Sequence, residues 1–221
     1  MAGGNYKIST GHIDSKFGIS IHQLRHVERI IKSLNLNVEG IHMHTGSDIL
    51  DVEVFLNGAA ILFDIALNFP NLKYIDFGSG FKVAYKPNDV TTDIAMLGKQ
   101  FTKRYEAFVE EYGRAIAIHF EPGKYLVSES GSFVTKVNVI KHTTATVFAG
   151  LDTGANHLIR PMFYDAYHHL TNLSNPNGTQ RVYTVVGYVC ETDTFAWDRP
   201  LPEVREGDYI CFHNAGAYGI M

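Results

Sequence analysis

Residues 72–80 read LKYIDFGSG, a short apolar run that ends in a glycine turn. A run of this kind is typical of a strand that is buried on both faces of a parallel sheet. The same unit, an amphipathic helix followed by a short apolar strand, occurs three times. The predicted helices cover residues 21–34, 51–67 and 92–112, and the predicted strands cover residues 38–43, 72–77 and 115–120. This order predicts part of an α/β domain.

Local signals support the predicted helix boundaries. Ser20 is a candidate N-cap for the first helix, because its hydroxyl can accept a hydrogen bond from a free backbone N–H. Pro70 ends the second helix, because proline cannot continue the helical hydrogen-bond pattern.

The pattern changes after residue 127. Short β-rich runs separated by turns such as NPNG follow at residues 134–140, 145–151, 181–189 and 208–212. We read this half as antiparallel β structure. The sequence therefore predicts two domains, an α/β part over residues 1–127 and an all-β part over residues 128–221.

Composition excludes several classes of protein. Hydrophobic residues make up 45% of the chain and charged residues 19%, so disorder is not expected. A net charge of -4 argues against a nucleic-acid partner. We found no apolar run long enough to span a bilayer and no apolar signal core at the N-terminus. With only Cys190 and Cys211, a reduced, cytoplasmic protein is predicted.

Polar residues follow the predicted strands, where parallel-sheet proteins place their ligands. His42 and His44 lie on one side of the first strand, because side chains alternate along a strand. They indicate either a metal site, with Asp76 or Glu121 as a further ligand, or a structural, hydrogen-bonded role. Glu121 opens the string EPGK and indicates either a ligand contact or a surface pair with Lys124.

The glycine turn of residues 78–80 allows backbone N–H groups to approach an anion. It is not a dinucleotide fingerprint, because the spaced third glycine is absent. Ser47 could add a hydroxyl and Lys124 a positive charge to the same anion. An ordinary turn remains the alternative.

The β half contains further candidates. Cys190 stands beside Glu191, and Arg160 suits a carboxylate because a guanidinium can bind it through two hydrogen bonds. Tyr218 lies in a loop of small residues. Each of these also has an ordinary structural explanation.

Together these segments resemble the fold-type III pyridoxal-phosphate (PLP) decarboxylases, and among them most closely those that act on diaminopimelate. Seven strings carry the resemblance, in the family's order: SKFGI (15–19), HMHTGS (42–47), DFGSGF (76–81), EPGK (121–124), RPMFYDA (160–166), CE (190–191) and AGAYG (215–219).

The resemblance implies the last three strands of an alanine-racemase-like (β/α)₈ barrel, followed by a Greek-key β domain. It also implies that the barrel strand carrying the PLP lysine, and the extreme C-terminus, lie outside this chain. The isolated chain is therefore expected to be inactive.

The resemblance also implies roles for the cofactor contacts. His44 would stack on the pyridine ring, and Glu121 would keep the ring nitrogen protonated, so that the ring can act as an electron sink. The phosphate would be held by Ser47, Gly78, Ser79, Gly80, Lys124 and Tyr218.

On the substrate side, Cys190 would act at the reacting carbon as proton donor and would come from the partner subunit of a homodimer. Glu191 would bind the distal amine, and Arg160 with Tyr164 the distal carboxylate. The implied reaction is decarboxylation of meso-2,6-diaminopimelate to L-lysine.

Two alternatives stay open: a related decarboxylase acting on ornithine, arginine or carboxynorspermidine, and a non-catalytic PLP-binding fragment. The chain departs from the family pattern at Ser79, where glycine is usual, and at Lys124, where arginine is usual. Lysine still binds phosphate but lacks the guanidinium fork.

Overall fold

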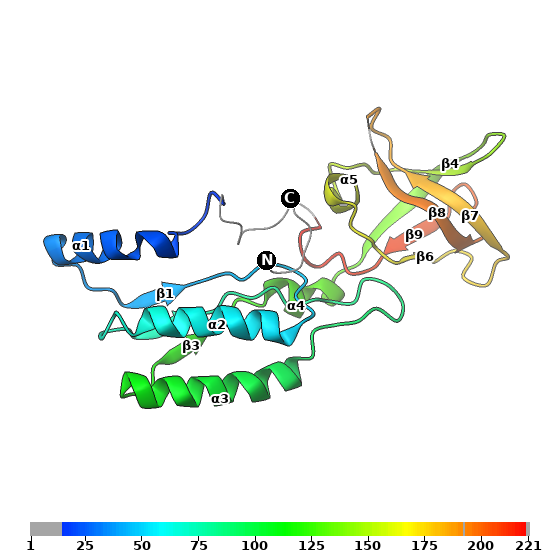
Figure 1. Cartoon of the computed structure of the whole chain (residues 1–221). Coiled ribbons are helices and arrows are strands. Elements are labelled where there is room, and N and C mark those ends of the chain that lie inside the picture. The colour runs from blue at the N-terminus through cyan, green and yellow to red at the C-terminus, as the bar shows by residue number, and fades with distance from the viewer. Residues whose placement is uncertain (1–14, 192, 220–221) are drawn as a thin grey trace. The chain divides into compact units, whose positions relative to one another are not determined.

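The computed structural model describes residues 15–191 and 193–219. The described residues form two compact units (Figure 1). One contains residues 15–83 and 90–125, and the other contains residues 84–89 and 126–219 apart from residue 192. No helix in the described part of the chain is both long and apolar enough to cross a membrane.

The first unit is built on a parallel sheet in the order β1-β2-β3. Its strands are β1 (Gly40–His42), β2 (Tyr74–Asp76) and β3 (Ala117–His119). Its helices are η2 (Ile21–Gln23), α1 (Leu24–Leu34), α2 (Val52–Ala66) and α3 (Ile94–Tyr112), and α2 lies beside α3 (Figure 1). The predicted helix–strand order is confirmed, although each strand is shorter than predicted.

Side chains at the helix ends explain where the helices begin. The Asp51 carboxylate accepts a hydrogen bond from the N–H of the second residue after it, and Asp93 from that of the third. Ser20 caps the short 3-10 turn η2 rather than α1, so the first α-helix begins later than predicted. Gly113 ends α3 with a φ of 83°, in the left-handed region that glycine adopts without strain.

The core of the first unit lies between the sheet and helices α2 and α3. Phe55 and Leu56 of α2 are fully buried, as are Ile75 and Phe77 from β2 and the residue after it. Phe77 meets Phe101 of α3 edge to face, with ring centroids 5.0 Å apart. This packing fixes β2, and therefore the polar residues that follow it.

The second unit contains a six-stranded sheet in the order β6-β9-β4-β5-β7-β8. The strands are β4 (Phe133–His142), β5 (Val147–Leu151), β6 (Leu170–Asn172), β7 (Gln180–Val186), β8 (Thr194–Pro202) and β9 (Tyr209–Phe212). Short helices α4 (Gly123–Val127), η3 (Ser128–Ser130) and α5 (Arg160–Tyr164) complete the described elements.

The prediction of a purely antiparallel second half is wrong at one place. Strands β5 and β7 pair in parallel, with Ala149 opposite Val185, whereas every other pair in this sheet is antiparallel. A parallel pair needs a long crossover, and residues 152–179, which include α5 and β6, provide it. Arg160 lies in this crossover.

Candidate active site

In the first unit, the three strands end together. Because the sheet is parallel, His42, Asp76 and His119 are direct neighbours at the C-terminal ends of β1, β2 and β3. The hydrogen bonds continue past the strands, since the Glu121 N–H donates to the Gly78 carbonyl oxygen at 2.7 Å. The segments that carry the predicted site residues therefore converge.

Glu121 lies beside His42 at this edge. His42 Nε2 is 3.3 Å from a Glu121 carboxylate oxygen, and both side chains are about half exposed. His42, Asp76 and Glu121 together form a group whose possible metal-ligand atoms lie within 4.8 Å of one another. One Asp76 oxygen already accepts a hydrogen bond from the Gly78 N–H at 2.9 Å, so Asp76 also shapes the turn that follows β2.

His44 lies against the glycine turn. A Cβ atom added to Gly78 would lie 2.8 Å from His44 Nδ1, so only glycine leaves room for this ring. Burial lowers the pKa of His44 below its ordinary value, and the Glu121 carboxylate opposes that effect. The structure thus brings together His44, the 78–80 turn and Glu121, with a neutral imidazole favoured at pH 7.

The turn has a left-handed backbone at both of its glycines. Gly78 and Gly80 have φ values of 57° and 114°, and Ser79 between them is buried. Consecutive backbone N–H groups in such a turn can point into one concavity. The Gly80 carbonyl oxygen accepts a hydrogen bond from the Ile49 N–H at 2.8 Å, which ties the turn to the segment after β1.

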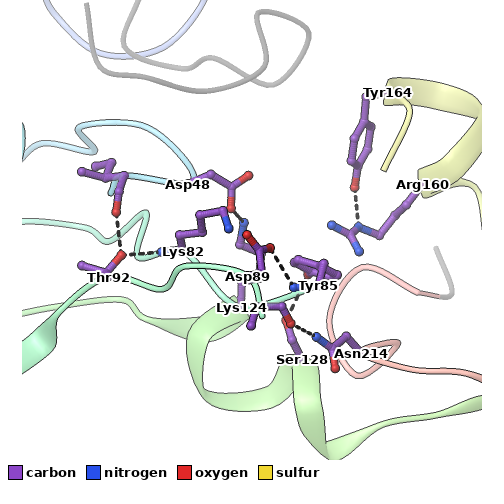
Figure 2. Close-up of polar contacts among 12 residues, drawn as sticks. Asp48, Lys82, Tyr85, Asp89, Thr92, Lys124, Ser128, Arg160, Tyr164 and Asn214 are labelled. Atoms are coloured by element: carbon purple, nitrogen blue, oxygen red, sulfur yellow. Dashed lines mark hydrogen bonds and ion pairs between the residues drawn. The ribbon is translucent and has the colours of Figure 1, made fainter. Parts of the chain in front are cut away.

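Lys124 has a partner that sequence reasoning missed. Its ammonium group forms an ion pair with the carboxylate of Asp48 (Figure 2). Asp48 follows Ser47, which is half-buried, and has a left-handed backbone with a φ of 55°. The charge of Lys124 is therefore already compensated within the described residues.

The second unit contains a buried arginine. Arg160, at the start of α5, is 5% exposed. Its Nε donates to the Tyr164 hydroxyl at 2.6 Å (Figure 2), and another guanidinium nitrogen lies 2.9 Å from His168 Nε2. The Tyr85 ring lies 4.6 Å from the guanidinium carbon. Among the described residues Arg160 forms no ion pair, so its positive charge lies beside neutral groups.

Cys190 and Glu191 are exposed in the loop between β7 and β8. Buried Asp193 supports this loop, because its carboxylate accepts hydrogen bonds from the N–H groups of Val189 and Ala155, both at 2.7 Å. No hydrogen bond or ion pair between described residues joins Cys190 or Glu191 to Arg160. Tyr218 is likewise exposed, with a left-handed φ of 54°.

Comparisons with known proteins agree on one family. The family model described as "Pyridoxal-dependent decarboxylase, C-terminal sheet domain" matches residues 49–216. The diaminopimelate decarboxylase of Methanothermobacter thermautotrophicus is 37% identical over 98% of this chain and 52% of its own length. That of Aquifex aeolicus is 34% identical over 96% and 50%.

Solved structures show the same similarity. A crystal structure of diaminopimelate decarboxylase superposes with a TM-score of 0.90 at 30% identity, over 98% of this chain and 55% of that chain. The Helicobacter pylori enzyme complexed with L-lysine gives a TM-score of 0.84 at 31% identity, over 98% and 54%.

The chain therefore belongs to the pyridoxal-dependent decarboxylase family, which confirms the family resemblance and, for the family, the predicted cofactor. Residues 49–216, which the family model matches, include parts of both units. The chain spans about half the length of the curated relatives it matches.

Sequence reasoning named His44, the glycine turn and Glu121 because each directly follows a strand. It missed Tyr85 and His168, which surround Arg160 in the second unit. Nothing in their local sequence marks them, since the contacts with Arg160 depend on the folded chain.

Proposed function

We propose that this chain forms part of the active site of a PLP-dependent carboxy-lyase that decarboxylates meso-2,6-diaminopimelate to L-lysine. Relatives at 34–37% identity that are named diaminopimelate decarboxylase support this substrate. The structural observation that carries the proposal is Arg160, a buried cation with neutral partners only.

A buried charge without a counter-charge is costly, and most proteins avoid it. Tyr164 and His168 satisfy hydrogen bonds of Arg160 without neutralising it. The site is therefore suited to an anionic ligand, and a guanidinium fork matches a carboxylate. Diaminopimelate has a second amino-acid head group, whose carboxylate Arg160 and Tyr164 would bind.

The residues at the strand ends of the first unit fit the cofactor. Glu121 would offer a carboxylate to a protonated ring nitrogen, and neutral His44 would offer a flat ring to stack on the pyridine. When bound, PLP supplies an electron sink for the charge left on the substrate carbon as CO₂ departs. Glu121 would hold the proton at the ring nitrogen, and His44 would fix the plane of the ring.

The glycine turn of residues 78–80, together with Ser47, Lys124 and Tyr218, would bind the phosphate. The Gly78 N–H already donates to Asp76 at 2.9 Å, so the N–H groups of Ser79 and Gly80 would be the main backbone donors to the phosphate. Lys124 would contribute less, because Asp48 already compensates its charge. The proposed phosphate contacts are Ser47, Gly78, Ser79, Gly80, Lys124 and Tyr218.

The exposed loop between β7 and β8 suits a contribution to a second active site. Cys190 would donate the proton to the reacting carbon, and Glu191 would bind the distal amine. We propose that both act across the interface of a homodimer. Their exposure, and the absence of hydrogen bonds or ion pairs between them and Arg160 among the described residues, support this arrangement.

At the level of the fold, we propose that residues 1–127 form the C-terminal part of a (β/α)₈ barrel and residues 128–221 a Greek-key domain, in a cytoplasmic enzyme. The parallel order β1-β2-β3 with preceding helices supports the first, and the six-stranded sheet supports the second.

The activity test uses the full-length product of the gene that encodes this chain. We expect CO₂ release and L-lysine formation from meso-diaminopimelate, with far slower turnover of ornithine, arginine and carboxynorspermidine. The isolated 221 residues should be inactive. Turnover of ornithine at a higher kcat/KM than that of diaminopimelate would contradict the proposal, because ornithine has no distal carboxylate for Arg160 to bind.

A matched pair of variants tests the role of Arg160. Replacing Arg160 by Met should raise KM for diaminopimelate about 10- to 100-fold, since a charge-assisted bidentate contact is lost. Arg181→Met in β7 is the control, because Arg181 is exposed and its ion pair is with Glu203 at 3.3 Å, far from Arg160 in the sequence. An unchanged KM in the Arg160 variant would refute the substrate assignment.

A further inference from the structure

His168 is buried beside Arg160 and has two fixed hydrogen-bond partners. The residue is 1% exposed. Its Nδ1 lies 2.8 Å from the His213 carbonyl oxygen, and its Nε2 lies 2.9 Å from a terminal nitrogen of Arg160.

These partners determine which ring nitrogen carries the proton. A carbonyl oxygen only accepts, so Nδ1 must donate to His213. A guanidinium only donates, so Nε2 must accept from Arg160. The ring is therefore neutral in one defined tautomer, because a second proton on Nε2 would point at the guanidinium.

The surroundings of His168 favour the same state. Burial lowers its pKa to about 4, the hydrogen bond to the His213 carbonyl opposes this, and the charges of Arg160 and Arg199 lower it further. Arg199 donates to the His168 carbonyl oxygen at 2.6 Å, and the Tyr85 ring meets the imidazole edge to face. No carboxylate pairs with Arg160 or Arg199 among the described residues.

Neutral acceptors orient a guanidinium without compensating its charge. Tyr164 holds Nε, His168 holds one terminal nitrogen, and Tyr85 covers one face at 4.6 Å. A carboxylate in place of His168 would hold Arg160 equally well, but it would also neutralise the charge. The remaining N–H donors of Arg160 keep their full attraction for an incoming anion.

We propose that His168 is a positioning residue that aims Arg160 at the distal carboxylate of the substrate and, by staying neutral, leaves the arginine charge for that carboxylate. The inference rests on the proposed function and deepens it. It predicts that recognition depends on the neutrality of residue 168 and not only on its packing.

Two nearly isosteric variants separate charge from packing. His168→Gln keeps a neutral acceptor near Arg160, whereas His168→Glu provides a carboxylate that pairs with it. In the full-length gene product, we expect KM for diaminopimelate to rise about 10- to 100-fold more in the Glu variant than in the Gln variant. The kcat values of the two should be similar, because the reacting centre is not touched.

Ligand binding gives a second readout. L-lysine retains a carboxylate and cadaverine has none, so calorimetry should show a preference for L-lysine in the wild-type and Gln proteins that the Glu variant loses. Should the Glu variant fail to fold, His168→Leu tests the orienting hydrogen bond instead. Leu is neutral but accepts no hydrogen bond, so KM should again rise more than in the Gln variant and the preference for L-lysine should be lost.

The outcomes distinguish this inference from the function on which it rests. If the wild-type protein neither decarboxylates diaminopimelate nor binds L-lysine, both fail. If it does either, and the Glu or Leu variant matches the Gln variant in KM and in preference for L-lysine, the positioning role alone is overturned.

Discussion

Gly80 provides a sharp test of the glycine turn that follows β2. Its φ of 114° lies in a region that side chains rarely adopt. A Cβ at this position would collide with the Gly46 carbonyl oxygen and would lie 3.0 Å from Ile49 Cδ1. Because the Gly46 oxygen belongs to the backbone, no side-chain rotation can relieve the collision in Gly80→Ala.

The expected cost has two parts. Holding a non-glycine residue in a sparsely populated backbone region costs about 1–3 kcal/mol. Overpacking against a rigid neighbour typically costs a further ~1–3 kcal/mol. We therefore expect Gly80→Ala to lower the free energy of unfolding by about 2–6 kcal/mol, a large share of the roughly 5–15 kcal/mol that stabilises a typical domain.

Gly98→Ala is the matched control. Gly98 lies inside α3, and a Cβ there would meet no atom within 4 Å. Because alanine is the better helix former, this change should stabilise the protein by about 0.5–1 kcal/mol.

Urea unfolding followed by far-UV circular dichroism measures both variants, and hydrogen exchange locates the loss to the segments around β1 and β2. A Gly80→Ala protein as stable as wild-type, with unchanged exchange in these segments, would refute the described turn geometry.

Three further predictions concern other parts of the molecule. Between pH 6.5 and about 4 the unfolded chain binds a proton at His168 that the native state does not, so the free energy of unfolding falls by about 3 kcal/mol as the pH drops through this window. The stability that the neutral histidine contributes is fully present above pH 6.5. Urea titrations at several pH values should show a smaller loss in His168→Gln. Tyr105→Phe should cost about 1–3 kcal/mol in urea unfolding, because the hydroxyl donates to the Ile116 carbonyl at 2.7 Å and accepts from its N–H at 3.2 Å; equal stability would count against these bonds. Cys190→Ala should lower kcat of the full-length gene product about 100-fold if the thiol donates the proton, whereas replacement of buried Cys211 should affect stability alone; steady-state rates compare the two.

The sequence was informative where a feature is local. The apolar periodicity predicts a helix over residues 51–67, and α2 covers Val52–Ala66 with the Asp51 carboxylate as its cap. The polar residues after β1, β2 and β3 were found because they follow apolar runs. The strands of the first unit were predicted too long, since the apolar pattern continues beyond the residues that pair, whereas β4 is longer than its predicted run.

The sequence was misleading where pairing decides the structure. Strand β8 was missed because Pro200 and Pro202 interrupt its pattern, yet prolines are tolerated on an edge strand, and β8 is at the edge of its sheet. The parallel pairing of β5 with β7 depends on a crossover whose path no local signal reveals. Long-range contacts likewise decide that Asp48 pairs with Lys124.

A buried or half-buried positive charge has a carboxylate partner in the first unit and neutral partners in the second. In the first unit, Lys124 has a carboxylate partner and its charge is compensated. In the second, Arg160 is more deeply buried and has only neutral partners among the described residues, and an uncompensated buried charge is costly. Stability alone therefore does not account for an arginine at this position. Arg160→Met removes the buried charge but leaves His168 Nε2 without its donor. Because these two effects oppose each other, we expect the free energy of unfolding to fall by no more than about 1–3 kcal/mol, and urea unfolding measures this change separately from the proposed loss of substrate binding.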